Sequence, residues 1–121
     1  QPTEVADYLA LSHVLVHLSH REGLPRAVPQ GFACGLPAVA YPLDGTPEVV
    51  LPGQTGCLVE MGDRPALVDA VVGYLADDDR RRADGERGRS MVLERFSIES
   101  MVAGIDRLYR QLLAEQSADG R

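Results

Sequence analysis

The residues between 19 and 30 combine polar side chains with a flexible backbone in a pattern that suits a phosphorylated ligand. Glu22 offers a carboxylate that can accept hydrogen bonds from sugar hydroxyls. Gly23 has no Cβ, so a ligand can approach the backbone closely there. A helix predicted to begin at Arg26 would turn its unpaired N–H groups and its positive end toward a phosphate. Gln30 lies further along this helix, at most about 12 Å from Glu22.

A second loop of similar character spans residues 42–47 and contains Gly45 and Thr46. The Thr46 hydroxyl can donate a hydrogen bond to a phosphate. Both loops follow short apolar segments, residues 14–18 and 37–41, that we predict to be buried strands. Ligands of open α/β sheets bind beyond the carboxyl ends of the strands, so we expect the two loops to meet at one edge. A nucleotide-sugar would present sugar, diphosphate and ribose to them in turn.

A purely structural interpretation accounts for the same residues. In that interpretation, Glu22 caps the following helix, and Gly23 and Gly45 are ordinary turn glycines. Residue types and spacing alone leave both interpretations open.

Short predicted strands alternate with predicted helices along the chain. Thr3 is the expected N-cap of a first helix, and a second helix over residues 26–34 is expected to end at Gly35. A third strand is predicted at residues 57–60. This alternation is typical of a parallel sheet with helices on both faces. We therefore expect an α/β protein with a partial Rossmann-like, doubly wound sheet of about three short strands, flanking helices and a long C-terminal helix.

The second half of the chain is predicted to be helical. Asp63 caps one helix, and we expect the acidic and basic residues 77–82 to form the solvated start of the next. The expected buried face of the first of these helices consists of Leu67, Ala70, Val71, Tyr74 and Leu75. Ser97 caps the last helix, whose apolar residues recur at helical spacing. Together with Phe96, they are expected to be core contacts against the sheet or a partner domain: Ile98, Met101, Val102, Ile105, Leu108, Tyr109, Leu112 and Leu113.

Composition excludes several classes of protein. The 121 residues carry a net charge of −6, which argues against a broad nucleic-acid-binding surface. All 12 basic residues are arginines, so no lysine chemistry is available in this sequence. No apolar run is long enough for a transmembrane segment. Because the chain opens on Gln1 and lacks the basic start of a signal peptide, we expect a cytoplasmic protein fragment.

Cysteine and histidine side chains give weaker indications of a functional site. Cys34 and Cys57 are expected to be two small buried thiols, because their spacing fits neither a disulfide framework nor a CxxC metal motif. A metal site built from His13, His17 and His20 is conceivable but not favoured. His17 is expected to pack in the sheet, and His20 is the better candidate for contacting a substrate.

Four segments, in order and with matching spacing, closely resemble group 1 (family 4) retaining glycosyltransferases. Residues 21–37 resemble the family's donor-site segment, in which two glutamates with seven residues between them precede a small-residue helix ending in Ala-x-Gly-x-Pro. Residues 45–50 resemble its Gly-Gly-x-Pro-Glu-Val segment. Residues 55–59 resemble its Thr-Gly-Leu-Leu-Val strand, and residues 95–97 match the Phe-Ser that opens its closing helix. The resemblance covers nearly the whole chain.

This resemblance implies a GT-B fold, in which two Rossmann-like domains enclose the active site. Residues 1–116 would be the later part of the C-terminal, nucleotide-sugar-binding domain, and residues 117–121 a frayed polar tail. By resemblance, Glu22 would be the catalytic-site residue beside the donor sugar. The backbone of Gly23 and Leu24 would face the diphosphate.

The same resemblance assigns further roles. Gln30 would bind the ribose, and Gly45 and Thr46 would lie near the sugar and phosphates. It implies neither a metal nor another cofactor, since basic residues from an earlier part of the domain neutralise the leaving diphosphate. A saccharide, lipid or small-molecule acceptor would bind mainly to the N-terminal domain, outside this chain. That domain could also make peripheral membrane contact.

Two departures from the family pattern bear on activity. Gln30 stands where the family usually has glutamate, and a neutral amide binds ribose hydroxyls less strongly than a carboxylate does. Asp44 stands where the family tends to have glycine, which puts an acid near the phosphates. Two alternatives to a transferase therefore remain: a non-catalytic nucleotide-sugar-binding or structural module with a degenerate donor site, and a GT-B nucleotide-sugar epimerase.

Overall fold

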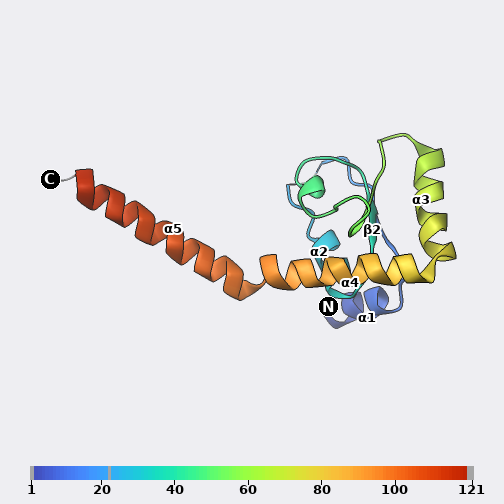
Figure 1. The fold of residues 1–121 in the computed structure, drawn as a ribbon, viewed down its shortest axis with the longest axis horizontal. Coiled ribbons are helices and arrows are strands. Elements are labelled where there is room, and N and C mark those ends of the chain that lie inside the picture. Colours follow the sequence, from blue (N-terminus) through green and yellow to red (C-terminus); the bar gives the residue numbers. More distant parts are fainter. Residues whose placement is uncertain (1, 22, 120–121) are drawn as a thin grey trace.

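A parallel sheet of three short strands forms the centre of the molecule (Figure 1). The structure is a computed structural model that describes residues 2–21 and 23–119. The strands are β1 (Leu15–His17), β2 (Ala38–Ala40) and β3 (Gly56–Leu58), in the order β1-β2-β3. Ala38 of the central strand lies opposite Leu15 on one side and Gly56 on the other. The prediction of an α/β protein with three parallel strands is confirmed.

Helices cover both faces of this sheet. The helices are α1 (Pro2–Ala10), α2 (Ala27–Ala33), α3 (Arg64–Ala76), α4 (Asp78–Arg95) and α5 (Ile98–Asp119), with a short 3₁₀ helix, η1 (Thr46–Glu48). Side chains of a strand alternate between its two faces. Ala38 and Ala40 therefore join the core under α2 and α4, whereas Val39 joins the core under α3. The larger core consists of Val28, Phe32, Ala38, Ala40, Val49, Val50 and Val92.

Two glycines bring α4 into very close contact with α2. A Cβ on Gly85 would lie 2.0 Å from the carbonyl oxygen of Gly35, and a Cβ on Gly88 would lie 2.6 Å from the Phe32 ring. Both glycines are buried. Gly35 itself has a φ of 76°, and it ends α2 in the left-handed conformation that the sequence predicts. Thus α2, the helix that follows the first predicted site loop, is held in place by close packing against two glycines of α4.

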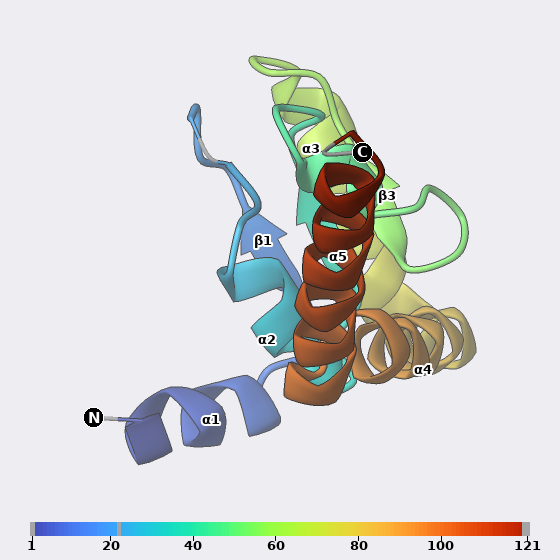
Figure 2. The same ribbon diagram turned by 90° about the vertical axis from the view of Figure 1, so that its left-hand side faces the viewer.

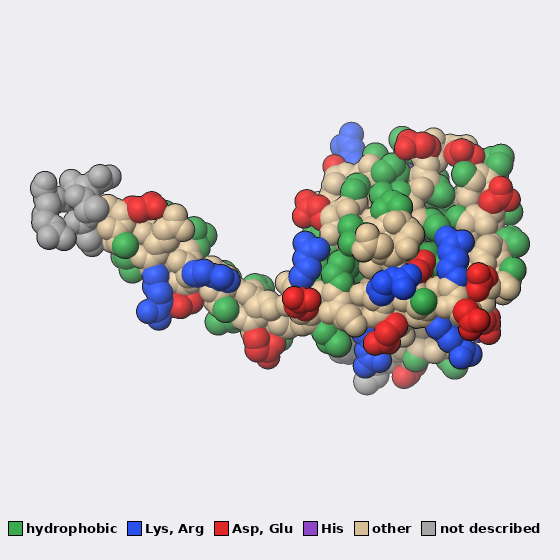
Figure 3. Space-filling model, viewed as in Figure 1, with side chains coloured by type: hydrophobic (Ala, Val, Ile, Leu, Met, Phe, Trp, Pro, Cys, Tyr) green, Lys and Arg blue, Asp and Glu red, His purple; other side chains and the backbone are tan. Residues whose placement is uncertain are grey.

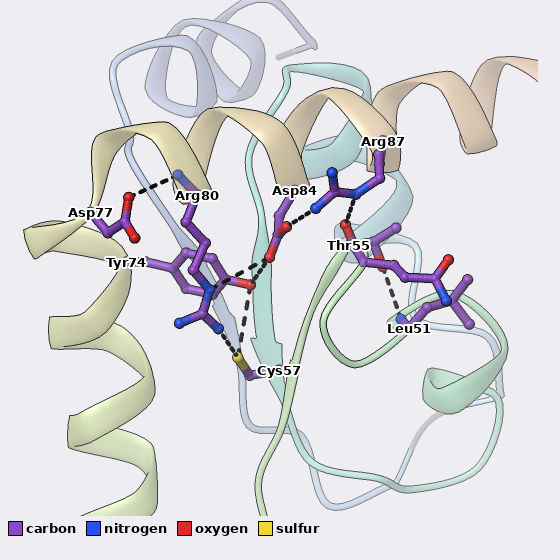
Figure 4. A network of polar contacts seen from close by, with 9 residues as sticks. Leu51, Thr55, Cys57, Tyr74, Asp77, Arg80, Asp84 and Arg87 are labelled. Carbon is purple, nitrogen blue, oxygen red and sulfur yellow. Dashed lines mark hydrogen bonds and ion pairs between the residues drawn. The ribbon is translucent and has the colours of Figure 1, made fainter.

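A polar network joins α3 and α4 to β3 on the other side of the sheet (Figure 4). The fully buried Tyr74 donates a hydrogen bond of 2.6 Å to the buried carboxylate of Asp84, which also pairs with Arg87. The Arg80 guanidinium lies 4.6 Å from the centre of the Tyr74 ring and 3.3 Å from the Cys57 sulfur. Burial and the hydrogen bond to Asp84 raise the pKa of Tyr74 above its ordinary value.

Most predicted helix boundaries are confirmed, with some corrections. Asp63 caps α3 by accepting the Ala66 N–H. Asp77 caps α4, and the expected solvated start is confirmed at Arg80 and Arg82, which are exposed, although the Arg80 guanidinium also packs on the Tyr74 ring. The first helix begins at Pro2, so Thr3 lies inside it and is not its N-cap.

Two expected buried side chains are exposed instead. Leu75 is 54% exposed because α3 turns its buried face through Tyr74, one residue earlier. The Cys34 thiol is exposed at the end of α2, and Cys57 is half-buried. Both cysteines are free.

The last helix, α5, projects away from the body of the molecule (Figure 1). Ser97 caps it through the Ser100 N–H, as predicted. Its apolar stripe does not pack against the sheet of the described chain, so that alternative is wrong, and contact with a partner domain stays a prediction: Ile98 is 72% exposed and Leu113 63% exposed, and Phe96 is also partly exposed. A helical period identifies an apolar face, but it does not identify what covers that face. No helix in the described part of the chain has the length and apolar character to cross a membrane.

Candidate functional site

The two loops that the sequence singled out meet at one edge of the sheet. The first leaves β1 after His17 and leads to α2, and the second leaves β2 after Ala40 and leads to η1. Both lie at the same end of the sheet, beyond the arrowheads of the strands (Figure 2). This is the edge at which parallel α/β sheets bind their ligands.

A backbone hydrogen bond joins the two loops. The Gly45 N–H donates to the Gly23 carbonyl at 2.9 Å. A Cβ on Gly45 would lie 2.7 Å from that carbonyl oxygen and 3.3 Å from the Leu24 side chain. Gly45 is therefore the residue at which the second loop touches the first, and its N–H is occupied by the protein itself.

The loop before α2 leaves several backbone N–H groups for a ligand. In the described part of the chain, the N–H groups of Leu24, Arg26 and Ala27 donate to no backbone carbonyl. Among the described residues, no side chain caps the start of α2 at Arg26. Gly23 is exposed and its backbone has open space around it. Unpaired donors beside an accessible glycine form a surface that an anionic oxygen can approach.

The second loop is firmly anchored under this surface. Thr46 is only 2% exposed, and its N–H donates to the Leu43 carbonyl at 3.0 Å. The Val50 N–H in turn donates to the Thr46 carbonyl at 2.9 Å. Next to it, Asp44 has a φ of 49°, in the left-handed region. Glycine adopts that region without a steric penalty, and aspartate is among the few other residues that enter it.

Gln30 lies on the exposed side of α2, next to α1. Its side chain borders a groove of about 320 Å³ between the two helices, which is otherwise lined by Val5, Ala6, Leu9, Ala33 and Cys34. The amide therefore faces an apolar groove and can both donate and accept hydrogen bonds there. It lies on the same helix as the N–H groups at the first loop, one turn further on.

Glu22 lies outside the described residues, so its predicted place beside the sugar stays a prediction. Close to it in sequence, the exposed His20 ring lies 6.0 Å from the Tyr41 ring, centre to centre. His20 thus lies near Tyr41, the residue that follows β2, and its contact with a substrate stays a prediction. His17 lies in β1 and is half-buried. Within residues 2–21 and 23–119, no three His, Cys, Asp or Glu side chains are grouped as metal ligands would be.

A larger cavity lies elsewhere, and we do not identify it with the site. It measures about 580 Å³ and opens between the turn at Leu51–Thr55 and one face of α4, including Arg87 and Arg95. Thr55 immediately precedes β3, so this cavity is at the edge where the strands begin, opposite to the two loops. Acidic and basic side chains intermingle on this face (Figure 3), which leaves no broad surface of one charge.

Comparison with known proteins is consistent with this arrangement. Residues 1–77 match the family model described as Glycosyl transferases group 1. N-acetyl-alpha-D-glucosaminyl L-malate synthase of Bacillus anthracis is 34% identical over 111 residues, which is 92% of this chain and 29% of that protein. The chain thus spans less than a third of the length of this relative.

Solved structures show the same fold. Sucrose-phosphate synthase of Thermosynechococcus elongatus superposes with a TM-score of 0.81 at 32% identity, over 93% of this chain and 28% of that one. HepE of Anabaena, solved in complex with UDP, superposes with a TM-score of 0.75 at 22% identity, over 89% of this chain and 29% of that one. These neighbours have the GT-B fold, so the strands and helices described above form part of that fold. The chain belongs to the group 1 glycosyltransferases.

Proposed function

We propose that this chain supplies part of the donor site of a glycosyltransferase that moves a sugar from a nucleotide-sugar to an acceptor with retention of anomeric configuration. The observation that carries the proposal is the junction of the two loops at the carboxyl edge of the sheet. There, the exposed backbone around Gly23 and Leu24 lies next to Gly45 and the buried Thr46. Family membership and the UDP bound to HepE support a nucleoside diphosphate as the ligand.

Each proposed contact follows from the chemistry of its group. The N–H groups of Gly23 and Leu24 donate to the diphosphate, which carries growing negative charge as the sugar leaves. Gln30 holds the ribose hydroxyls from the second turn of α2. Thr46 supports the second loop from below, and Glu22 accepts hydrogen bonds from hydroxyls of the donor sugar. In this proposal, backbone dipoles and basic residues outside this sequence stabilise the leaving group, without a metal.

A titration followed by NMR tests the binding part of this proposal. The 121-residue chain, labelled with ¹⁵N, is titrated with UDP and with GDP. We expect the largest changes in chemical shift at the amides of Gly23, Leu24 and Ala27. Changes confined to residues around the cavity between the Leu51–Thr55 turn and α4 would refute the site.

The catalytic part needs a polypeptide of the length of the relatives. With such a polypeptide that carries this sequence, turnover of a nucleotide-sugar and NMR of the product decide the reaction and its stereochemistry. Nucleotide binding without turnover would instead support a non-catalytic binding module. An inverted anomeric centre in the product would refute retention.

A further inference from the structure

We infer that Gly45 is a positioning residue that acts on the donor through Gly23. Its N–H holds the Gly23 carbonyl at 2.9 Å and thereby fixes the peptide units that face the diphosphate. This inference rests on the proposed function. It changes the role of Gly45 from a residue in direct contact with the nucleotide-sugar to a residue that supports such a contact.

The contact requires a residue without a side chain. A Cβ at position 45 would lie 2.7 Å from the Gly23 carbonyl oxygen and 3.4 Å from the Leu24 Cα, both of which are backbone atoms. Real Cβ atoms essentially never approach another atom to within 3.0 Å. Backbone atoms cannot rotate out of the way as a side chain can. Any other residue at position 45 therefore pushes the two loops apart.

Backbone hydrogen bonds anchor the second loop, whereas the first depends on this contact. Gly45 lies in a chain of backbone hydrogen bonds, since its carbonyl accepts the Glu48 N–H at 3.1 Å, and it adjoins the buried Thr46. In contrast, the first loop is largely exposed. Among residues 18–21 and 23–24, the Gly23 carbonyl is the one backbone group that forms a hydrogen bond with another segment of the described chain. The anchored loop thus sets the position of the exposed one.

The hydrogen bond also orients the backbone N–H group that remains available to the diphosphate. A carbonyl and the N–H of the next residue belong to one planar peptide unit. When the Gly23 carbonyl is held by Gly45, the Leu24 N–H of the same unit is fixed in the opposite direction. A fixed donor needs no reorganisation when charge develops on the diphosphate.

The substitution Gly45→Ala tests this role. We expect the Kd for UDP to rise between about tenfold and a hundredfold, because a displacement on the order of 1 Å misplaces the backbone N–H groups that bind the diphosphate. Gly73→Ala in α3 is the matched control, since its Cβ would meet only the Arg80 side chain at an ordinary 3.7 Å. This control should bind UDP as the wild type does. The double variant Gly45→Ala, Leu24→Ala removes the side-chain contact but keeps the carbonyl contact, so binding should stay weak.

The outcomes separate this inference from the proposed function. No binding of UDP by the wild type refutes the proposed function, and the inference with it. Wild-type binding together with unchanged affinity in Gly45→Ala overturns the inference alone, as does recovery of affinity in the double variant. If Gly45→Ala fails to fold, hydrogen exchange in the wild type decides. We expect the Gly45 amide to exchange slowly before UDP is added; rapid exchange there, slowed only by UDP, would show that Gly45 contacts the ligand directly.

Discussion

The close contact between α4 and the end of α2 makes Gly85 a sensitive test of the packing described above. A Cβ at this position would lie 2.0 Å from the Gly35 carbonyl oxygen, so α4 has to move by on the order of 1 Å in Gly85→Ala. Overpacking of a core typically costs about 1–3 kcal/mol. Alanine in a helix interior is more favourable than glycine by about 1 kcal/mol of folding free energy, which offsets part of this cost. Because the obstructing atom belongs to the backbone, we expect a net loss of about 2 kcal/mol in the free energy of unfolding.

Urea denaturation measures this loss as a lower midpoint at an unchanged slope. Gly73→Ala again serves as the control, since it makes the same change in a helix where the new Cβ has room. It should be neutral or stabilise the chain by up to about 1 kcal/mol. A Gly85→Ala variant that is as stable as Gly73→Ala would refute the tight α2–α4 contact, and with it the reasoning that α4 holds the site helix in place.

Three further predictions follow from the site and the network. Tyr74→Phe leaves the buried Asp84 carboxylate with one donor fewer and should cost about 1–3 kcal/mol in thermal or urea unfolding near neutral pH. Because the pKa of Tyr74 is raised in the folded state, the neutral phenol contributes stability that is fully present below its ordinary pKa of about 10 and is lost as the pH rises further. Urea midpoints should therefore fall above pH 10 in the wild type and fall less in Tyr74→Phe; parallel curves would contradict this. Gln30→Glu should tighten nucleotide binding in calorimetry, since a charge-assisted hydrogen bond is roughly twice as strong as a neutral one; equal or weaker affinity would contradict a ribose contact. The 121-residue chain alone should turn over no nucleotide-sugar in a coupled assay, since it covers only 29% of the length of the Bacillus anthracis relative, and any turnover would refute this.

The apolar stripe of α5 lies outside the core of the described residues. Its side chains repeat at helical spacing, and yet all of them are exposed in the structure. The superposition on sucrose-phosphate synthase includes 93% of the chain, so it takes in most of this helix. The contact of this stripe with a partner domain, one of the two alternatives that the sequence suggested, stays a prediction.

Local sequence signals located most of the elements and the two site loops. Strands β1 and β2 were predicted because short apolar runs between polar loops are typical of buried strands. Gly35, Asp63 and Ser97 marked helix ends through local chemistry, which needs no tertiary partner. The loops could be paired in advance because parallel strands place their carboxyl ends at one edge.

Only the tertiary structure decided which groups meet. Gly45 looked like a direct donor contact from the sequence, but its N–H is bonded to a carbonyl of the other loop, more than twenty residues earlier in the chain. Tyr74 was expected in the core and Arg80 in a solvated helix start, and the structure joins both of them to the buried Asp84 in one polar network. The spacing of Gly85 and Gly88 by three residues was the available signal for close helix packing.

The sequence by itself therefore determined the order of the elements, the family pattern and the position of the donor loops along the chain. Periodicity and capping are local properties, and they are encoded within a few residues of where they act. The hydrogen bond between Gly45 and Gly23, the contact of α4 with the end of α2, and the exposure of α5 depend on which distant segments lie side by side. Such pairings are set by the packing of the whole core, which no local pattern of residues contains.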